Sequence, residues 1–216
     1  MAPGTSLGDA LDYLKAQAQQ VLPKGYTYDY SGESRQYAQQ GSTMIVTLLL
    51  SVLVIYLVLA AQYESWRDPF IILVSVPMSI AGALIFITLG LSTINIYTWV
   101  GLITLVGIIA KNGILIVQFA NQLQLNDRLS KREAVEQAAR IRLRPILMTT
   151  VAMIVAMVPL LTATGPGAVS RFDMGLVIAT GLGIGTLFTL FVVPAVYMLL
   201  ARDHAAAQAK AEAQAS

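Results

Sequence analysis

Lys111 is the residue of this chain whose type and position most clearly suggest chemistry. It lies just past the midpoint of residues 96–120, 25 residues that contain no other charged side chain. At about 1.5 Å of rise per residue, a helix of that length crosses a bilayer. An ammonium at the bilayer centre costs roughly 2.5 to 3.5 kcal/mol on insertion scales, so a lysine there needs a polar partner and is usually functional. Two structural alternatives stay open: the side chain snorkels to the interface, or it pairs with a backbone carbonyl.

Small and polar residues share a helical face with Lys111. In a helix over residues 96–120 that face carries Thr104, Gly107, Ile108, Ile114, Leu115 and Gln118. Small residues let a second helix approach closely, so Gly107 is predicted to be a packing residue. Three more small residues at four-residue spacing predict a second packing face in the last apolar run, namely Gly175, Ala179 and Gly183.

A second group of residues with possible chemistry occupies RIRLRPILMTT, residues 140–150. Arg140, Arg142 and Arg144 alternate up to Pro145, which indicates the entrance to a membrane helix rather than a voltage sensor, whose arginines recur at every third residue. For Arg140 and Arg144 the favoured explanation is that they are merely positive-inside anchors. Thr149 follows one turn inside the membrane, where its hydroxyl could bond the carbonyl four residues earlier or line a polar path.

The composition is that of an integral membrane protein. Of 216 residues, 56% are hydrophobic and 12% are charged, against about 25% charged in soluble domains. A net charge of +2 gives no reason to expect nucleic-acid binding. The chain has no cysteine and one histidine, His204, so neither a transition-metal site nor another cofactor is expected. It also lacks a catalytic triad, a glycine-rich phosphate loop and paired carboxylates, and we predict that it is not an enzyme.

The apolar runs predict an all-α integral membrane fold, a bundle of five spans. These are residues 43–62, 70–90, 96–120, 145–163 and 174–200, with a surface helix at about 128–141 and a tail at 202–216. None of the spans contains Asp or Glu. An acidic partner for Lys111 must therefore come from elsewhere, or the lysine is neutral.

Residues 1–41 are polar and predict a small α/β unit. Ser6 and Asp9 resemble a capping box for a helix that Pro23 stops, and residues 26–30 alternate like a short strand. One helix and one strand cannot bury a core, so we interpret this stretch as the end of a larger soluble domain. The first 40 residues also lack the pattern of a signal peptide, which leads us to expect further spans upstream.

Lys and Arg are distributed unequally between the two sides that five spans define. Nine lie on the side of residues 121–144 and the C-terminus, and four lie on the side of residues 1–41. Because basic residues accumulate in cytoplasmic loops, we predict a cytoplasmic C-terminus and an N-terminus outside the cytoplasm.

Three stretches resemble a known family: LAAQYESWRDPFIILVSVPMSIAGAL, VGLITLVGIIAKNGILIVQFAN and RIRLRPILMTTVAMIVAMVPL. They are similar to the C-terminal membrane half of resistance-nodulation-division efflux pumps of the hydrophobe/amphiphile subfamily, over almost the whole chain up to Arg202. Such pumps have twelve spans in two repeated halves and two large periplasmic loops, form trimers, and exchange protons for drugs. The resemblance implies that the five spans are the eighth to twelfth and that residues 1–41 end the second periplasmic porter region.

The resemblance also assigns roles to single residues. Lys111 matches the proton-relay lysine that pairs with two aspartates of the N-terminal half, Thr149 matches the relay threonine, and Arg142 matches an arginine near the cytoplasmic end of the proton path. A lysine between carboxylates in low dielectric can change partner when one of them takes up a proton, so these groups titrate together and protons are the coupling ion. The implied partners are the N-terminal half, a homotrimer of the full pump, a periplasmic adaptor and an outer-membrane channel.

We therefore predict that the chain is the C-terminal membrane portion of a proton-driven multidrug efflux transporter in the Gram-negative inner membrane, with a periplasmic N-terminus. Without both aspartates and the drug-binding domain it should not transport alone. One alternative is a non-transporting membrane scaffold or assembly subunit. Another member of the superfamily, such as a protein-export subunit or a lipid exporter, is disfavoured by the AKN and RLRPILMT strings.

Overall fold

The computed structural model describes residues 7–23 and 25–203, and in this part of the chain all regular structure is helical. The helices are α1 (Leu7–Val21), α2 (Glu33–Tyr63), α3 (Arg67–Leu73), α4 (Ser75–Thr88), α5 (Ile96–Asn126), α6 (Lys131–Leu161) and α7 (Ala168–Leu200). Five helical stretches are long and apolar enough to cross a membrane: Thr43–Tyr63, Arg67–Thr88, Ile96–Asn126, Lys131–Leu161 and Ala168–Leu200. The prediction of an all-α fold with five spans is confirmed.

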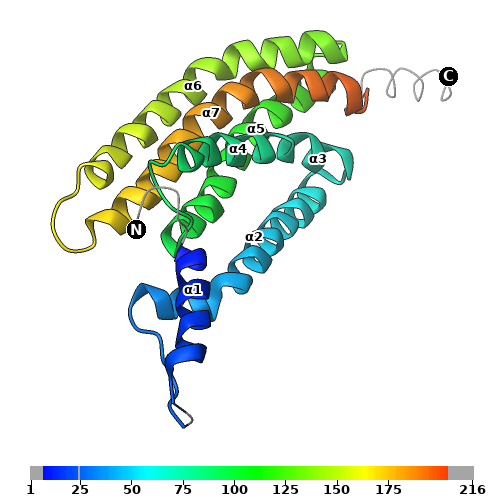
Figure 1. Ribbon diagram of the computed structural model, residues 1–216. Helices are drawn as coiled ribbons and strands as arrows, with labels where there is room; N and C mark the ends of the chain where they lie inside the picture. The colour runs from blue at the N-terminus through cyan, green and yellow to red at the C-terminus, as the bar shows by residue number, and fades with distance from the viewer. Residues whose placement is uncertain (1–6, 24, 204–216) are drawn as a thin grey trace.

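Helix α7 lies at the centre of the bundle. It packs against α4, α5 and α6, whereas α2 touches mainly α3 and α5. Figure 1 shows α2 joined to the bundle at the α3 end and splaying away from it toward α1. The membrane-spanning part of α2 consequently leaves most of its apolar side chains uncovered by the described chain.

Glycines allow α7 to approach its neighbours closely. A Cβ atom built at Gly82 of α4 would lie 2.7 Å from Cβ of Ile184 on α7, and one built at Gly185 would lie 2.6 Å from Oγ of Ser79 on α4. The Ser79 hydroxyl also donates to the carbonyl of Gly181 at 2.9 Å. Short side chains at these positions therefore permit both van der Waals contact and a hydrogen bond between α4 and α7.

Two glycines of the packing face predicted for the last span, Gly175 and Gly183, face α6 rather than α4. A Cβ at Gly175 would lie 3.0 Å from Cβ of Leu160 on α6, and one at Gly183 would lie 3.7 Å from Cδ1 of Ile154 on the same helix. Ala179 lies between them and is half-buried. A Cβ at Gly107, in contrast, would meet no described atom within 4 Å. The packing role of Gly107 therefore stays a prediction, and the helix that would pack there is not among the described residues.

The strand expected over residues 26–30 does not form, so the described N-terminal part has no α/β character. A strand needs a hydrogen-bonded neighbour, and the described residues provide none. Instead the Tyr26 amide donates to the Pro23 carbonyl at 3.2 Å, and the Tyr30 amide donates to Oδ1 of Asp29 at 2.8 Å. The helix before Pro23 is present as α1. Ser6, His204 and the tail from 204 onward lie outside the described residues.

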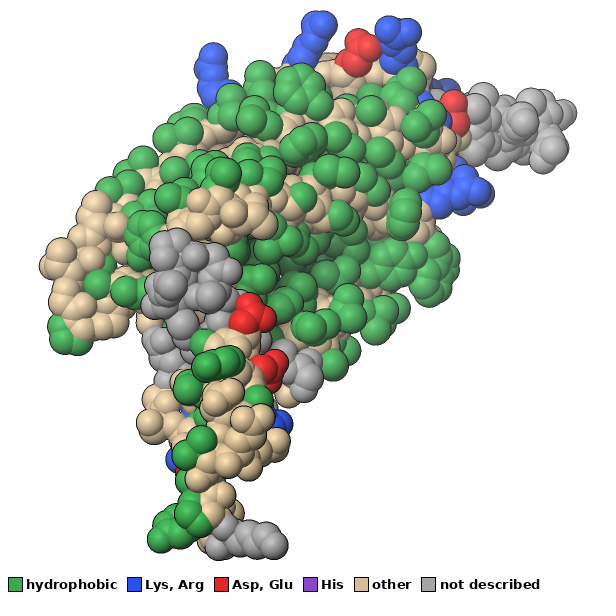
Figure 2. Space-filling view, viewed as in Figure 1, with side chains coloured by type: hydrophobic (Ala, Val, Ile, Leu, Met, Phe, Trp, Pro, Cys, Tyr) green, Lys and Arg blue, Asp and Glu red, His purple; other side chains and the backbone are tan. Residues whose placement is uncertain are grey.

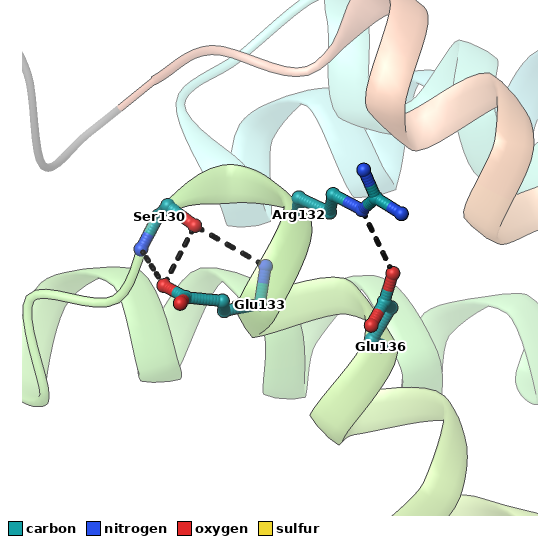
Figure 3. Close-up of polar contacts among 4 residues, drawn as sticks. All are labelled: Ser130, Arg132, Glu133 and Glu136. Atoms are coloured by element: carbon teal, nitrogen blue, oxygen red, sulfur yellow. Dashed lines mark hydrogen bonds and ion pairs between the residues drawn. The ribbon is translucent and has the colours of Figure 1, made fainter.

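Residues 128–141 do not form a separate surface helix, because residues 131–141 are the first third of α6. Ser130 caps α6: its hydroxyl oxygen accepts from the Glu133 amide at 3.3 Å, and the Glu133 carboxylate accepts from the Ser130 hydroxyl at 2.7 Å (Figure 3). The apolar side chains of the first turns, Ala134, Val135 and Ala138, are buried in a cluster formed with α5 and α7. They pack on the protein, and α6 continues through Pro145 to Leu161.

The second span is divided into α3 and α4 at Val74. Pro77 lies four residues after Leu73 and lacks the amide hydrogen that would bond the Leu73 carbonyl, which explains a break at this point. Pro69, in contrast, lies in the first turn of α3, where a missing amide hydrogen costs nothing.

Candidate functional site

Lys111 lies on the side of α5 that the rest of the described chain leaves uncovered. We call this side the open face of α5; its exposed residues are Val100, Thr104, Gly107, Lys111, Gln118, Gln122 and Leu125. The opposite side of the helix is buried against α7 and α4. The Lys111 ammonium makes no hydrogen bond or ion pair with any described residue. Within the part of the chain that the structure describes, the Lys111 amino group therefore lies without a partner at the middle of a membrane-spanning helix.

The N-terminal cap of α5 determines where along the helix Lys111 lies. Oδ1 of Asn95 accepts from the amides of Tyr97 and Thr98 at 2.9 and 3.0 Å, and Oγ1 of Thr98 accepts from the Asn95 amide at 2.8 Å. The helix therefore begins at Ile96. Lys111 follows fifteen residues later, about 22 Å along the axis at 1.5 Å per residue.

Thr149 and Thr150 of α6 have different surroundings. Thr149 is exposed, and its hydroxyl donates to the Ile146 carbonyl at 3.0 Å. Thr150 is buried, and its hydroxyl lies 3.2 Å from the hydroxyl of Thr186 on α7. The Thr186 hydroxyl oxygen also accepts from the side-chain amide of Asn112 at 3.4 Å. Sequence reasoning missed this Asn112, Thr186 and Thr150 network, which holds α5, α6 and α7 together directly beside Lys111.

Arg142 contacts α5 without reaching Lys111. Its guanidinium carbon lies 4.5 Å from the centroid of the Phe119 ring, in cation–π contact. Phe119 lies eight residues after Lys111, about 12 Å farther along α5. The Arg142 Nε is buried and has no hydrogen-bond partner in the described chain.

The three predicted relay residues thus share one region without bonding one another. Arg142 and Thr149 are seven residues apart and lie on the same side of α6, and α6 packs against α5. In the described chain, no hydrogen bond joins either of them to Lys111. The roles of these residues stay predictions.

Comparison with known proteins identifies the family. A family model described as the AcrB/AcrD/AcrF family matches residues 1–201. The chain belongs to the AcrB/AcrD/AcrF family. The resemblance to resistance-nodulation-division efflux pumps is thereby confirmed.

Several curated members of the AcrB/AcrD/AcrF family and related transporters are similar over most of the chain. An uncharacterized transporter of Haemophilus influenzae is 52% identical over 94% of this chain. The toluene efflux pump membrane transporter TtgB of Pseudomonas putida is 43% identical over 89% of it, and the multidrug export protein AcrF of Escherichia coli is 39% identical over 93%. The matches cover 20%, 18% and 19% of these relatives. The chain therefore spans about a fifth of the length of the curated relatives it matches.

This AcrB/AcrD/AcrF-family chain buries two aspartates that lie just outside the predicted spans. Asp173 of α7 accepts from the Ser92 hydroxyl at 2.7 Å and from the Asn95 side-chain amide at 2.5 Å. Asn95 lies sixteen residues before Lys111, about 24 Å away along α5. The Asp173 carboxylate is thus already hydrogen-bonded and too distant to pair with Lys111.

Asp68 of α3 belongs to a similar network at the other end of the bundle. Its Oδ2 accepts from the side-chain amide of Asn121 at 3.1 Å. The Tyr197 hydroxyl donates to Oδ1 of Asn121 at 2.5 Å and accepts from the amide of Gln124 at 2.7 Å. Asn121 lies ten residues after Lys111, about 15 Å along α5. Neither buried aspartate therefore pairs with Lys111. Both could have been recognised in the sequence, because each is a single acidic residue next to an apolar run.

Proposed function

We propose that this chain is the C-terminal membrane portion of a proton-driven multidrug efflux transporter and carries the lysine side of its proton relay. The observation that supports this most directly is the position of Lys111 in a member of the AcrB/AcrD/AcrF family. Its ammonium is exposed midway along a membrane-spanning helix and unpaired among the described residues. An intramembrane cation of this kind calls for an acidic partner.

In this proposal the partner is a helix of the N-terminal half that carries two aspartates and covers the open face of α5. Thr104 and Gly107 precede Lys111 on that face. Because threonine is small and glycine has no side chain, the helix could approach α5 closely there. With the lysine between two carboxylates, protonation of one carboxylate weakens its attraction for the ammonium, which then moves toward the other. Proton uptake on one side of the membrane is thereby converted into a displacement of α5.

Thr149 and Arg142 would line the path by which protons reach or leave Lys111. Thr149 lies exposed on α6, and Arg142 lies nearer the end of that helix rich in Lys and Arg. By the positive-inside rule this end is cytoplasmic, so the N-terminus lies on the opposite side of the membrane. Membership of the AcrB/AcrD/AcrF family supports the Gram-negative inner membrane, which makes that side the periplasm. Protons are the coupling ion, and no other cofactor is part of the proposal. The assembled pump would be a homotrimer with a periplasmic adaptor and an outer-membrane channel.

The test uses a complete pump whose C-terminal membrane part is this chain, with or without the change Lys111→Ala. Dye efflux should be abolished in the variant, because two facing carboxylates without their cation hold a proton and no longer cycle. Lys111→Arg should restore efflux only partly, since a planar guanidinium does not replace a compact ammonium that changes partner. Thr149→Ala should have a smaller effect, because a hydroxyl contributes only about 1 kcal/mol per hydrogen bond in membrane interiors.

Gln118→Ala is the matched control, because Gln118 is exposed on the same face of α5 two turns beyond Lys111. This variant should export dye at the unmodified rate, with equal expression and trimer assembly in all variants. Normal export by the Lys111→Ala pump, with a normal dependence on the proton gradient, would show that Lys111 has only a packing role.

A second experiment separates a transporter part from a non-transporting scaffold. The 216-residue chain alone should insert into proteoliposomes without exporting dye. Co-production with the rest of the pump, which comprises its first seven spans and its periplasmic loops, should restore proton-dependent efflux. A complex that forms but never exports would favour the scaffold, whereas export by the chain alone would contradict the need for outside carboxylates.

A further inference from the structure

The outward surface of α6 has two sectors of different composition. One, which we call the threonine sector, carries the small exposed residues Thr149, Ala152 and Ala156. The other, the arginine sector, carries Arg140, Arg144, Met148, Val151 and Val155, which follow one another at intervals of three or four residues and so form a stripe along one side of the helix.

Both arginines of the arginine sector are available for an outside partner. Arg140 and Arg144 are exposed and make no hydrogen bond or ion pair with the described residues. Neighbouring arginines differ: Arg142 lies over the Phe119 ring, and Arg132 pairs with Glu136 at 3.0 Å. Figure 2 shows basic side chains standing out along the edge of the molecule that α6 forms in Figure 1, with hydrophobic patches beside them.

The apolar residues of the stripe are equally uncovered. Met148, Val151 and Val155 are 66%, 57% and 59% exposed. Helix contacts inside membranes are enriched in small residues, which α6 presents in its threonine sector. The arginine sector presents large apolar side chains instead, and a helix covering it would also have to supply an acid for each arginine.

The position of the arginines along α6 matches the layers of a bilayer. Residues 145–161 rise about 26 Å, close to the roughly 30 Å of a hydrocarbon core. Arg144 then lies at the edge of that core, and Arg140 lies about 6 Å farther out, within the headgroup layer. Met148, Val151 and Val155 lie at the depth of the acyl chains.

We propose that the arginine sector binds an anionic phospholipid. The lipid phosphate accepts hydrogen bonds from the guanidinium groups of Arg140 and Arg144, whose planar forks match phosphate oxygens. The acyl chains lie along Met148, Val151 and Val155. This site requires that α6 crosses the membrane and that lipid covers the arginine sector. It does not depend on Lys111, so it stands or falls separately from the proton relay.

Quenching of tryptophan fluorescence by brominated lipids tests the site on the full 216-residue chain in nanodiscs. Met148→Trp provides the reporter one turn from Arg144, with Trp66 and Trp99 replaced by Phe. Brominated phosphatidylglycerol should quench it with a binding preference of about fivefold or more over brominated phosphatidylcholine, since each basic residue near a charged lipid surface contributes on that scale. Arg140→Gln with Arg144→Gln should abolish the preference.

Arg132→Gln is the matched control, because Arg132 lies in the first turn of α6 and already pairs with Glu136 (Figure 3). It should leave the preference unchanged, and circular dichroism should show equal helix content in all variants. A preference that survives the double substitution, or none in the chain with both arginines, would overturn the proposal. So would cross-linking of position 148 to another protein rather than to lipid in native membranes.

Discussion

Gly82 of α4 is the position at which a single added methyl group tests the packing of this bundle. A Cβ atom there would lie 2.7 Å from both Cβ and Cγ2 of Ile184 on α7, whereas non-bonded carbon atoms prefer about 3.5 to 4.0 Å. Cβ of Ile184 is bonded to the helix backbone, so no change of rotamer removes it. Helices α4 and α7 must therefore separate by about 1 Å in the Gly82→Ala chain.

The expected result is a loss of stability. Overpacking of a core costs about 1 to 3 kcal/mol, and the higher helix propensity of alanine returns up to about 1 kcal/mol. Because the overlapping atom is Cβ of Ile184 and not the end of a flexible side chain, the overpacking cost should fall at about 2 to 3 kcal/mol, which leaves a net loss of about 1 to 2 kcal/mol. Titration of the purified chain from mild detergent into SDS, followed by far-ultraviolet circular dichroism, measures it as a lower midpoint of unfolding.

Gly107→Ala is the matched control, because a Cβ at Gly107 meets no described atom within 4 Å. This variant should unfold at the same midpoint as the unmodified chain or at a slightly higher one. If Gly82→Ala is as stable as the unmodified chain, or if both variants lose the same stability, the close approach of α4 and α7 is not what stabilises the bundle.

Two further predictions concern topology and a buried carboxylate. A reporter fused after residue 125 should be cytoplasmic and one at residue 167 periplasmic, because of the unequal distribution of Lys and Arg; finding both on one side would contradict the five-span arrangement. Asp173→Ala should cost about 1 to 3 kcal/mol in the same SDS titration, since it leaves the half-buried partners Ser92 and Asn95 without the carboxylate that accepts from them. Replacement of the exposed Asp12 by Ala should leave the midpoint unchanged, and an equal shift in both variants would argue against the buried network.

The number of spans and the position of Lys111 within one of them followed from the sequence alone. Twenty or so apolar residues suffice to identify a membrane helix, because the cost of inserting polar groups depends on the segment itself and not on its neighbours. The family followed for a similar reason: the strings around Lys111 and residues 140–150 are local and specific. The first residue of α5, Ile96, also matched the expectation, whereas the helix ends at Asn126, six residues beyond the predicted end of the span.

Which side of each helix is covered could not be inferred in the same way. Lipid chains and a protein core are similarly apolar, so an apolar residue facing lipid looks like one facing another helix. For this reason the sequence did not distinguish Thr149 from the buried Thr150, nor the glycines that contact α4 from those that contact α6. The burial of Asp68 and Asp173 likewise required the packed bundle, because each acid is satisfied by partners more than fifty residues away along the chain.

The two errors of the sequence analysis have the same origin. Residues 128–141 have the pattern of an amphipathic surface helix, but from Lys131 onward their apolar side meets α5 and α7, and this part forms one continuous helix with the fourth span. Residues 26–30 alternate like a strand, but a strand depends on a neighbour distant in the chain, which the described residues do not contain. Local patterns thus determined where helices cross the membrane, while contacts between distant segments decided which of their faces are buried.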